Sequence, residues 1–122
     1  MCLNTLTHWE KPLIIAIDFD NTITADPALF REYINMATRR GHVVYIVTAR
    51  LKTVHPEDLD PWRGIVDGVY FTEHKAKRAF MEAQGIKVDV MIDDCPEAWV
   101  EDYNGAPRTF DTERDAQEKA GE

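Results

Sequence analysis

Short, mainly apolar runs of strand length, separated by amphipathic stretches, constrain the fold of this chain most strongly. LIIAID (13–18), VVYIVT (43–48) and VDVMID (88–93) are rich in β-branched residues. A fourth run, VDGVYF (66–71), is weaker because Gly68 interrupts it. Strands that are apolar on both faces are typical of a parallel sheet covered by helices on both sides. The sequence therefore predicts an α/β fold.

The stretches between these runs have helical signals. ALFREYINMATRR (28–40) has its apolar residues at a helical spacing, follows Asp26-Pro27 and stops before Gly41. KAKRAFMEAQ (75–84) is a second predicted helix, with Gly85 as its C-cap. Weaker elements are expected in three further places: one helical turn after Pro56 in the polar stretch 51–62, a short helix over 96–103, and a fifth strand over APRTFD (106–111).

The length of 122 residues predicts a single domain, 1–122, with a core of about 12–111 and a charged tail over 112–122. The pattern predicts a three-layer Rossmann-like fold with a mainly parallel, five-stranded sheet. No apolar run approaches the ~18 residues of a membrane span, and the N-terminus does not resemble a signal peptide, so we expect a cytoplasmic protein. A net charge of −8 argues against a broad nucleic-acid-binding face.

Polar side chains stand where the predicted strands end. In open α/β sheets the binding crevice lies beyond the carboxyl ends of the strands, so these side chains are expected to converge there. The residues concerned are Asp18 and Asp20 after the first strand, Thr48 at the end of the second, Lys75 and Lys77 after the third, and Asp93 and Asp94 after the fourth.

The chemistry of this set favours metal-assisted phosphoryl transfer. Four carboxylates in one crevice repel one another unless a cation neutralises them, and hard oxygen ligands suit Mg²⁺. Strand alternation places Asp18 and Asp20 on the same side, so that one can attack phosphorus while the other handles the proton of the leaving group. Thr48 and a lysine would hold the phosphoryl oxygens.

In their order along the chain, these motifs resemble those of the haloacid dehalogenase superfamily of phosphohydrolases. The first motif of that family is DxDx[TV] after an apolar strand, and DFDNT (18–22) matches it. Thr48 matches the second motif, a lysine before a helix matches the third, and MIDD (91–94) matches the fourth. The resemblance covers residues 13–94.

The resemblance implies a role for each matched residue. Asp18 would be the nucleophile and a metal ligand, and Asp20 would be the general acid/base and offer its backbone carbonyl to Mg²⁺. Thr48 and the lysine would bind the phosphoryl group. Of the acidic pair, Asp94 would bind the metal directly, and Asp93 would lie next to the metal ligands without contacting the metal. The chain is thus expected to be an Mg²⁺-dependent phosphatase that forms an aspartyl-phosphate.

The turn after the first strand and the choice of the phosphate-binding lysine are specific to this chain. Asn21 stands where this family usually has glycine, and Asn tolerates left-handed backbone angles better than most other residues. For the phosphate-binding lysine we favour Lys75, which is closer to the strand end, with Lys77 as the alternative. The short intervals between the motifs leave no room for a cap domain.

An uncapped site suits a bulky phosphorylated substrate or closure by a neighbouring subunit. The sequence leaves the oligomeric state open, and it leaves the substrate open among a nucleotide, a sugar phosphate, a phosphoprotein and a polynucleotide end. Two alternative functions are a receiver-like phospho-accepting domain and a non-catalytic binding module of the same fold. The order of the motifs disfavours a receiver, whose acidic pair should close the first strand and whose phospho-acceptor the third.

Overall fold

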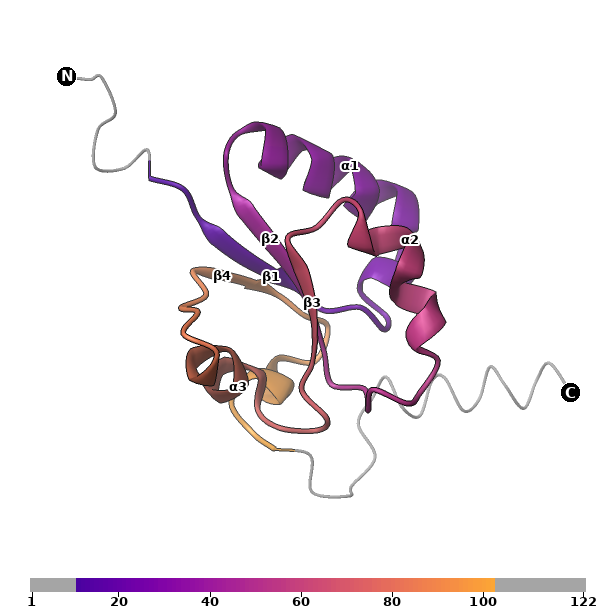
Figure 1. Ribbon diagram of the computed structural model, residues 1–122, viewed down its shortest axis with the longest axis vertical. Helices are drawn as coiled ribbons and strands as arrows, with labels where there is room; N and C mark the ends of the chain where they lie inside the picture. The colour runs from indigo at the N-terminus through magenta and orange to yellow at the C-terminus, as the bar shows by residue number, and fades with distance from the viewer. Residues whose placement is uncertain (1–10, 103–122) are drawn as a thin grey trace, which may run out of the picture.

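A parallel β-sheet forms the centre of the protein. The computed structural model describes residues 11–102, and in these the sheet has four strands in the order β3-β2-β1-β4, with every neighbouring pair parallel (Figure 1). The strands are β1 (Ile14–Ile17), β2 (Val43–Thr48), β3 (Gly68–Phe71) and β4 (Val90–Ile92). The predicted parallel α/β fold is confirmed with four strands instead of five. The stretch expected to form the fifth, 106–111, and the tail 112–122 lie outside the described residues.

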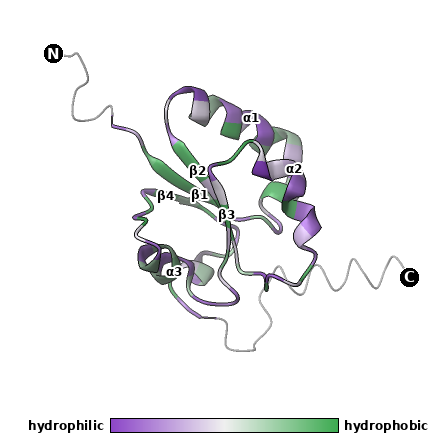
Figure 2. Ribbon diagram, viewed as in Figure 1, coloured by the Kyte–Doolittle hydropathy of each residue, from purple (hydrophilic) through white to green (hydrophobic). Residues whose placement is uncertain are grey.

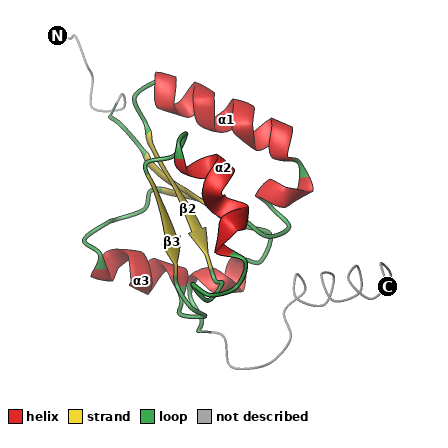
Figure 3. Ribbon diagram, turned by 45° about the vertical axis from the view of Figure 1, so that its right-hand side comes forward, coloured by secondary structure: helices red, strands yellow, loops and turns green. Residues whose placement is uncertain are grey.

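Helices cover both faces of the sheet, which gives three layers (Figures 1 and 3). On one face lie α1 (Pro27–Arg39) and α2 (Asp60–Arg63), and on the other lies α3 (Lys77–Ala83). Three 3₁₀ turns complete the structure: η1 (Ile23–Ala25), η2 (Pro56–Leu59) and η3 (Pro96–Trp99). The arrangement is Rossmann-like. No helix within residues 11–102 combines the length and apolar character needed to cross a bilayer.

Alternation along the strands divides the core between the two faces. Ile15 and Ile17 of β1 pack into the cluster under α1 and α2, whereas Ala16 between them packs with Met81 of α3. Figure 2 shows the strands β1 and β2 as apolar and α1 as mixed, as expected for a sheet buried on both sides by amphipathic helices.

Local signals account for the ends of α1. The Asp26 carboxylate accepts a hydrogen bond from the Leu29 backbone N–H at 3.1 Å, and Pro27 occupies the first helical position. Gly41, with φ +90°, reverses the chain after the helix. The predicted range 28–40 is therefore confirmed to within one residue at each end.

The segment between β2 and β3 contains more helix than the sequence predicts. The single turn expected after Pro56 is η2, and α2 follows it directly. Leu59 and Trp62 are buried against the core, which holds this segment on the α1 side of the sheet. Period-based reasoning missed α2 because the helix is only four residues long.

Asn21 occupies a tight turn directly after β1. Its φ is +61°, in the left-handed region that was expected from its place in the motif. Its backbone N–H donates to Thr24 Oγ at 2.8 Å. Its side-chain Nδ2 is buried without a hydrogen-bond partner among residues 11–102. The turn therefore depends on the backbone angle of Asn21 and not on its side-chain amide.

This turn predicts how two small substitutions differ. Glycine adopts a left-handed backbone without strain, whereas alanine pays about 1–2 kcal/mol for it. We expect Asn21→Ala to have a free energy of unfolding about 1 kcal/mol below that of Asn21→Gly, measured by urea denaturation. An alanine variant at least as stable as the glycine variant would contradict the backbone geometry described here.

Candidate functional site

Asp18 and Asp93 lie side by side at the carboxyl edge of the sheet. β1 and β4 are adjacent and parallel, and the register pairs Ile17 with Ile92. The Asp18 backbone N–H donates to the Ile92 carbonyl at 2.9 Å, so the pairing of the two strands continues to the point where the carboxylates begin. The convergence predicted from the strand ends is observed for these two residues.

The Lys77 ammonium lies between the two carboxylates. Its Nζ is 2.7 Å from Asp18 Oδ1 and 2.7 Å from Asp93 Oδ2, and its side chain is 1% exposed. Lys75, the lysine favoured from the sequence, is exposed in the turn before α3, while the alternative, Lys77, is the first residue of the helix and points into the site. Sequence reasoning placed the start of this helix two residues too early, at position 75.

Thr22 joins the site from the loop after β1. Its Oγ is 3.0 Å from Asp18 Oδ2 and 3.1 Å from Asp94 Oδ1, and it accepts a hydrogen bond from the Asp94 backbone N–H at 3.1 Å. The sequence analysis assigned Thr22 no role, although it is the last residue of the DFDNT motif. Its position in this motif, four residues after Asp18, was the signal in the sequence that Thr22 could belong to the site.

Three carboxylates are close enough to hold a metal ion. Oxygen atoms of Asp18, Asp93 and Asp94 lie within 4.8 Å of one another. One ammonium, from Lys77, faces these three acidic groups, so the fully ionised cluster has an excess of two negative charges. An all-oxygen donor set with uncompensated negative charge fits a hard divalent cation. The three carboxylates could therefore serve as a metal-binding group.

Burial dominates the electrostatics of Asp18. Burial raises the pKa of Asp18 to about 8, because Lys77 only partly opposes burial and the Asp93 charge adds to it. Burial alone would lower the pKa of Lys77, but the neighbouring Asp18 and Asp93 carboxylates outweigh burial and raise it. Lys77 therefore remains protonated. A cation bound to the cluster would stabilise the ionised form of Asp18.

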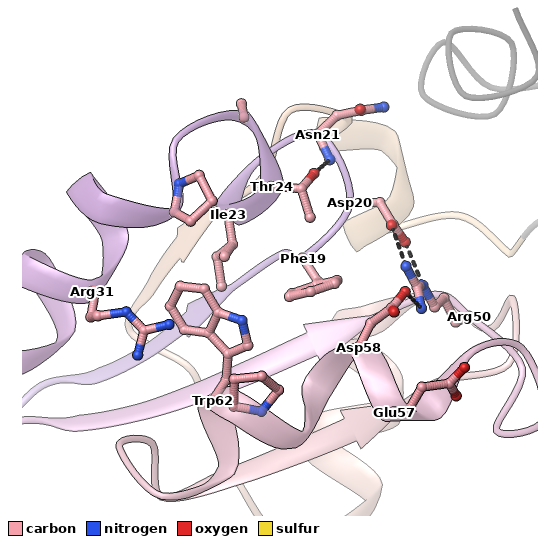
Figure 4. Close-up of a pocket in the computed structure, with 13 residues that line it drawn as sticks. Phe19, Asp20, Asn21, Ile23, Thr24, Arg31, Arg50, Glu57, Asp58 and Trp62 are labelled. Atoms are coloured by element: carbon pink, nitrogen blue, oxygen red, sulfur yellow. Dashed lines mark hydrogen bonds and ion pairs between the residues drawn. The ribbon is translucent and has the colours of Figure 1, made fainter. Parts of the chain in front are cut away.

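The side chain of Asp20 is turned to a different partner. Arg50 Nε donates to Asp20 Oδ2 at 2.9 Å and Arg50 Nη2 donates to Asp20 Oδ1 at 2.7 Å, a bidentate pair (Figure 4). The carboxylate of Asp20 is therefore not part of the group formed by Asp18, Asp93 and Asp94. The expected contribution of its backbone carbonyl to the metal stays a prediction.

Arg50 is buried, with a side chain 6% exposed. Besides Asp20 it binds the Asp58 carboxylate at 2.9 Å and donates to the backbone carbonyls of Val54, at 3.3 Å, and His55, at 2.9 Å. Arg50 connects the loop after β2 to the loop after β1.

Thr48 is buried at the end of β2, 1% exposed. Its Oγ accepts a hydrogen bond from the Arg50 backbone N–H at 3.3 Å. Within residues 11–102 this hydroxyl makes no hydrogen bond to Asp18, Asp93 or Asp94. The structure thus places Thr48 at the predicted strand end, and its contact with a phosphoryl group stays a prediction.

A cavity of about 1110 Å³ opens beside Asp20, between the segment that contains η1 and the start of α1 and the segment that contains η2 and α2 (Figure 4). We call it the Phe19–Trp62 cavity, after the two aromatic side chains in its wall. The Asp20–Arg50 pair stands at one end of it in Figure 4 and Arg31 at the other. The cavity is large enough for a small organic molecule, and of the acidic residues predicted at the strand ends Asp20 is the one that lines it.

Comparison with protein-family models, curated proteins and solved structures finds no match to this chain.

The position of Lys77 predicts the cost of removing its charge. Lys77→Met leaves two buried carboxylates facing each other without a cation, and we expect it to lower the free energy of unfolding by about 3–5 kcal/mol. The matched variant Lys75→Met changes an exposed side chain and should stay within about 0.5 kcal/mol of wild type. Urea denaturation measures both, and equal effects would contradict the placement of Lys77.

The raised pKa of Asp18 predicts a pH-dependent metal affinity. Below about pH 8 Asp18 is largely protonated in the metal-free protein, so a bound cation has to displace a proton. We expect the apparent affinity for Mg²⁺, measured by calorimetry, to rise about tenfold from about pH 6 to about pH 7 and to level off above about pH 8. In Asp18→Asn this pH dependence should disappear. Equal affinities for wild type at the two lower pH values would rule out such proton displacement.

Proposed function

We propose that this protein is an Mg²⁺-dependent phosphomonoester hydrolase of the haloacid dehalogenase type that works through an aspartyl-phosphate on Asp18. One observation carries the proposal: the Asp18 carboxylate is buried at the end of β1, in contact with the Lys77 ammonium and within a group of three carboxylates that can hold a cation. A nucleophile, a cation for the phosphoryl oxygens and a metal site thus meet at one strand end.

The nucleophilic step would use Asp18. A carboxylate oxygen attacks phosphorus, and the bond from phosphorus to the leaving-group oxygen breaks with its electron pair on that oxygen. Asp20, which takes up a proton from solvent when it turns away from Arg50, passes that proton to the departing alcohol. Water, deprotonated by Asp20, then attacks the phosphorus of the aspartyl-phosphate, releasing inorganic phosphate and returning Asp18 to its carboxylate form.

The hydrogen bonds of the acidic pair support different roles for its two members. Asp93 receives an N–H donor on each oxygen: Lys77 Nζ on Oδ2 and the Cys95 backbone N–H, at 2.9 Å, on Oδ1. Asp94 is more exposed, and Thr22 Oγ lies 3.1 Å from its Oδ1. Asp94 and Asp18 are therefore proposed as direct ligands and Asp93 as the residue that orients Lys77. Bound Mg²⁺ would neutralise charge on the phosphoryl oxygens.

Asp20 needs access to the leaving group, and its surroundings support this. Asp20 lines the Phe19–Trp62 cavity, on the side where a leaving group can be accommodated. Arg50 holds both oxygens of Asp20 but also binds Asp58, so that the guanidinium keeps an ionic partner when Asp20 turns towards a substrate. The proposal assigns to Arg50 the role of positioning Asp20 between turnovers.

The geometry gives less support to the two alternatives. A receiver-like domain should have its phospho-acceptor after its third strand, where this chain has Thr72. A non-catalytic binding module has no need for a nucleophile, a buried ammonium and a third carboxylate in mutual contact. The substrate class, a cytoplasmic location and the absence of a cap remain parts of the proposal.

The central test is the Asp18→Asn variant. An amide oxygen is a far poorer nucleophile than a carboxylate, so we expect turnover of a generic aryl phosphate with Mg²⁺ to fall about 10³-fold or more. Circular dichroism should show an unchanged fold. Asp60→Asn, at an exposed position of α2, is the matched control and should retain full activity.

Mass spectrometry of acid-quenched wild-type protein during turnover should locate the phosphoryl group on Asp18. Full activity in Asp18→Asn would contradict the mechanism. A single round of labelling followed by slow hydrolysis would instead favour the receiver-like function.

A further inference from the structure

The wall of the Phe19–Trp62 cavity has an ordered arrangement of aromatic rings and cations. The Arg50 guanidinium lies 5.3 Å from the Phe19 ring centre, the Phe19 and Trp62 rings are 6.4 Å apart at an angle of 79°, and the Arg31 guanidinium lies 4.5 Å from the Trp62 ring centre. A cation therefore stands at each end of an aromatic wall, as Figure 4 shows.

The two cations differ in what they already bind. Arg50 is buried and occupied by Asp20, Asp58 and two backbone carbonyls. Arg31 is exposed, stacks on Trp62 and has no carboxylate or carbonyl acceptor among residues 11–102. A guanidinium stacked on an indole keeps its N–H edge available and has fewer rotamers to lose, which suits it to bidentate binding of a carboxylate or phosphate.

The carboxylates that line the cavity do not neutralise the Arg31 guanidinium. Asp20 and Asp58 both accept hydrogen bonds from Arg50. The third, Glu57, lies on the Arg50 side of the cavity in Figure 4, away from Arg31. None of the three carboxylates that line the cavity therefore lies at its Arg31 end.

We propose that the Phe19–Trp62 cavity binds the leaving group of the substrate, and that this leaving group carries a second anionic group that Arg31 binds. The inference rests on the proposed function for the position of the phosphoryl group beside Asp20. The body of the leaving group occupies the cavity beside the Asp20–Arg50 pair, and its anionic end reaches the Arg31 guanidinium. Arg31 is a specificity-determining residue and takes no part in the chemical step.

The test compares esters that differ only in charge at the far end. The probes are 4-carboxyphenyl phosphate and its uncharged amide, 4-carbamoylphenyl phosphate, together with the corresponding pair of biphenyl phosphates, which reach further along the wall. For each pair the ratio of kcat/KM, acid over amide, is measured in wild type and in Arg31→Gln. Because leaving-group reactivity is the same in both proteins, it cancels when the two ratios are compared.

We expect the ratio for at least one pair to be about tenfold higher in wild type than in Arg31→Gln, as a charge-assisted hydrogen bond allows. Arg39→Gln, an exposed arginine in the last turn of the same helix, is the matched control and should keep the wild-type ratio. Two results would overturn the inference and leave the phosphatase proposal in place. One is an unchanged ratio in Arg31→Gln for both pairs, and the other is a wild-type preference for an aminomethyl ester over the carboxylate.

A binding measurement separates the two proposals. The corresponding biphenyl phosphonates, acid and amide, cannot be hydrolysed, and calorimetry with Mg²⁺ gives their affinities directly. If wild type prefers the acid and Arg31→Gln abolishes this preference, the leaving-group site is supported. This holds even if wild type hydrolyses none of the esters, because the absence of hydrolysis would refute only the proposed phosphatase. Equal affinity of wild type for the two phosphonates overturns the leaving-group site.

Discussion

The buried ion triad of Lys77, Asp18 and Asp93 is the interaction on which the rest of the site depends. Taking an ammonium and two carboxylates out of water is costly, and the short contacts of Lys77 Nζ with both acids offset that cost. The triad joins the start of α3 to the ends of β1 and β4 and therefore fixes where three elements meet. It also leaves the cluster with more negative than positive charge, which is the physical reason to expect a bound cation.

The parallel sheet is what brings these groups together. Asp18 and Asp93 are far apart in sequence, but they follow two adjacent strands that run in the same direction. The apolar β1, buried on both faces, keeps the Asp18 backbone rigid up to its hydrogen bond with Ile92. A nucleophile that must meet phosphorus in a defined direction benefits from such a support.

Arg50 organises the second half of the site. By binding Asp20 on one side and Asp58 and the loop carbonyls on the other, it holds the segment after β2 against the loop after β1. The Phe19–Trp62 cavity lies between these two segments. The proposed acid/base residue and the proposed leaving-group site therefore depend on the same buried guanidinium, so that an Arg50 substitution would disturb both together.

The sequence by itself determined the α/β class, the parallel strands, the limits of α1 and the identity of the acidic residues at the strand ends. It could do so because strand-length apolar runs, helical periodicity and capping residues are local signals. The left-handed turn at Asn21 belongs to the same group, since it depends on one residue and its neighbours.

Only the tertiary structure decided which lysine enters the site, that Thr22 links Asp18 to Asp94, and that Asp20 faces Arg50 instead of the other carboxylates. Lys75 and Lys77 are two residues apart, and their difference arises from where α3 begins and which way its first residue points. The burial of Arg50 and the stacking of Arg31 on Trp62 likewise come from the packing of α1 and α2 over one face of the sheet. Such contacts join segments that are distant in sequence, and no local pattern encodes them.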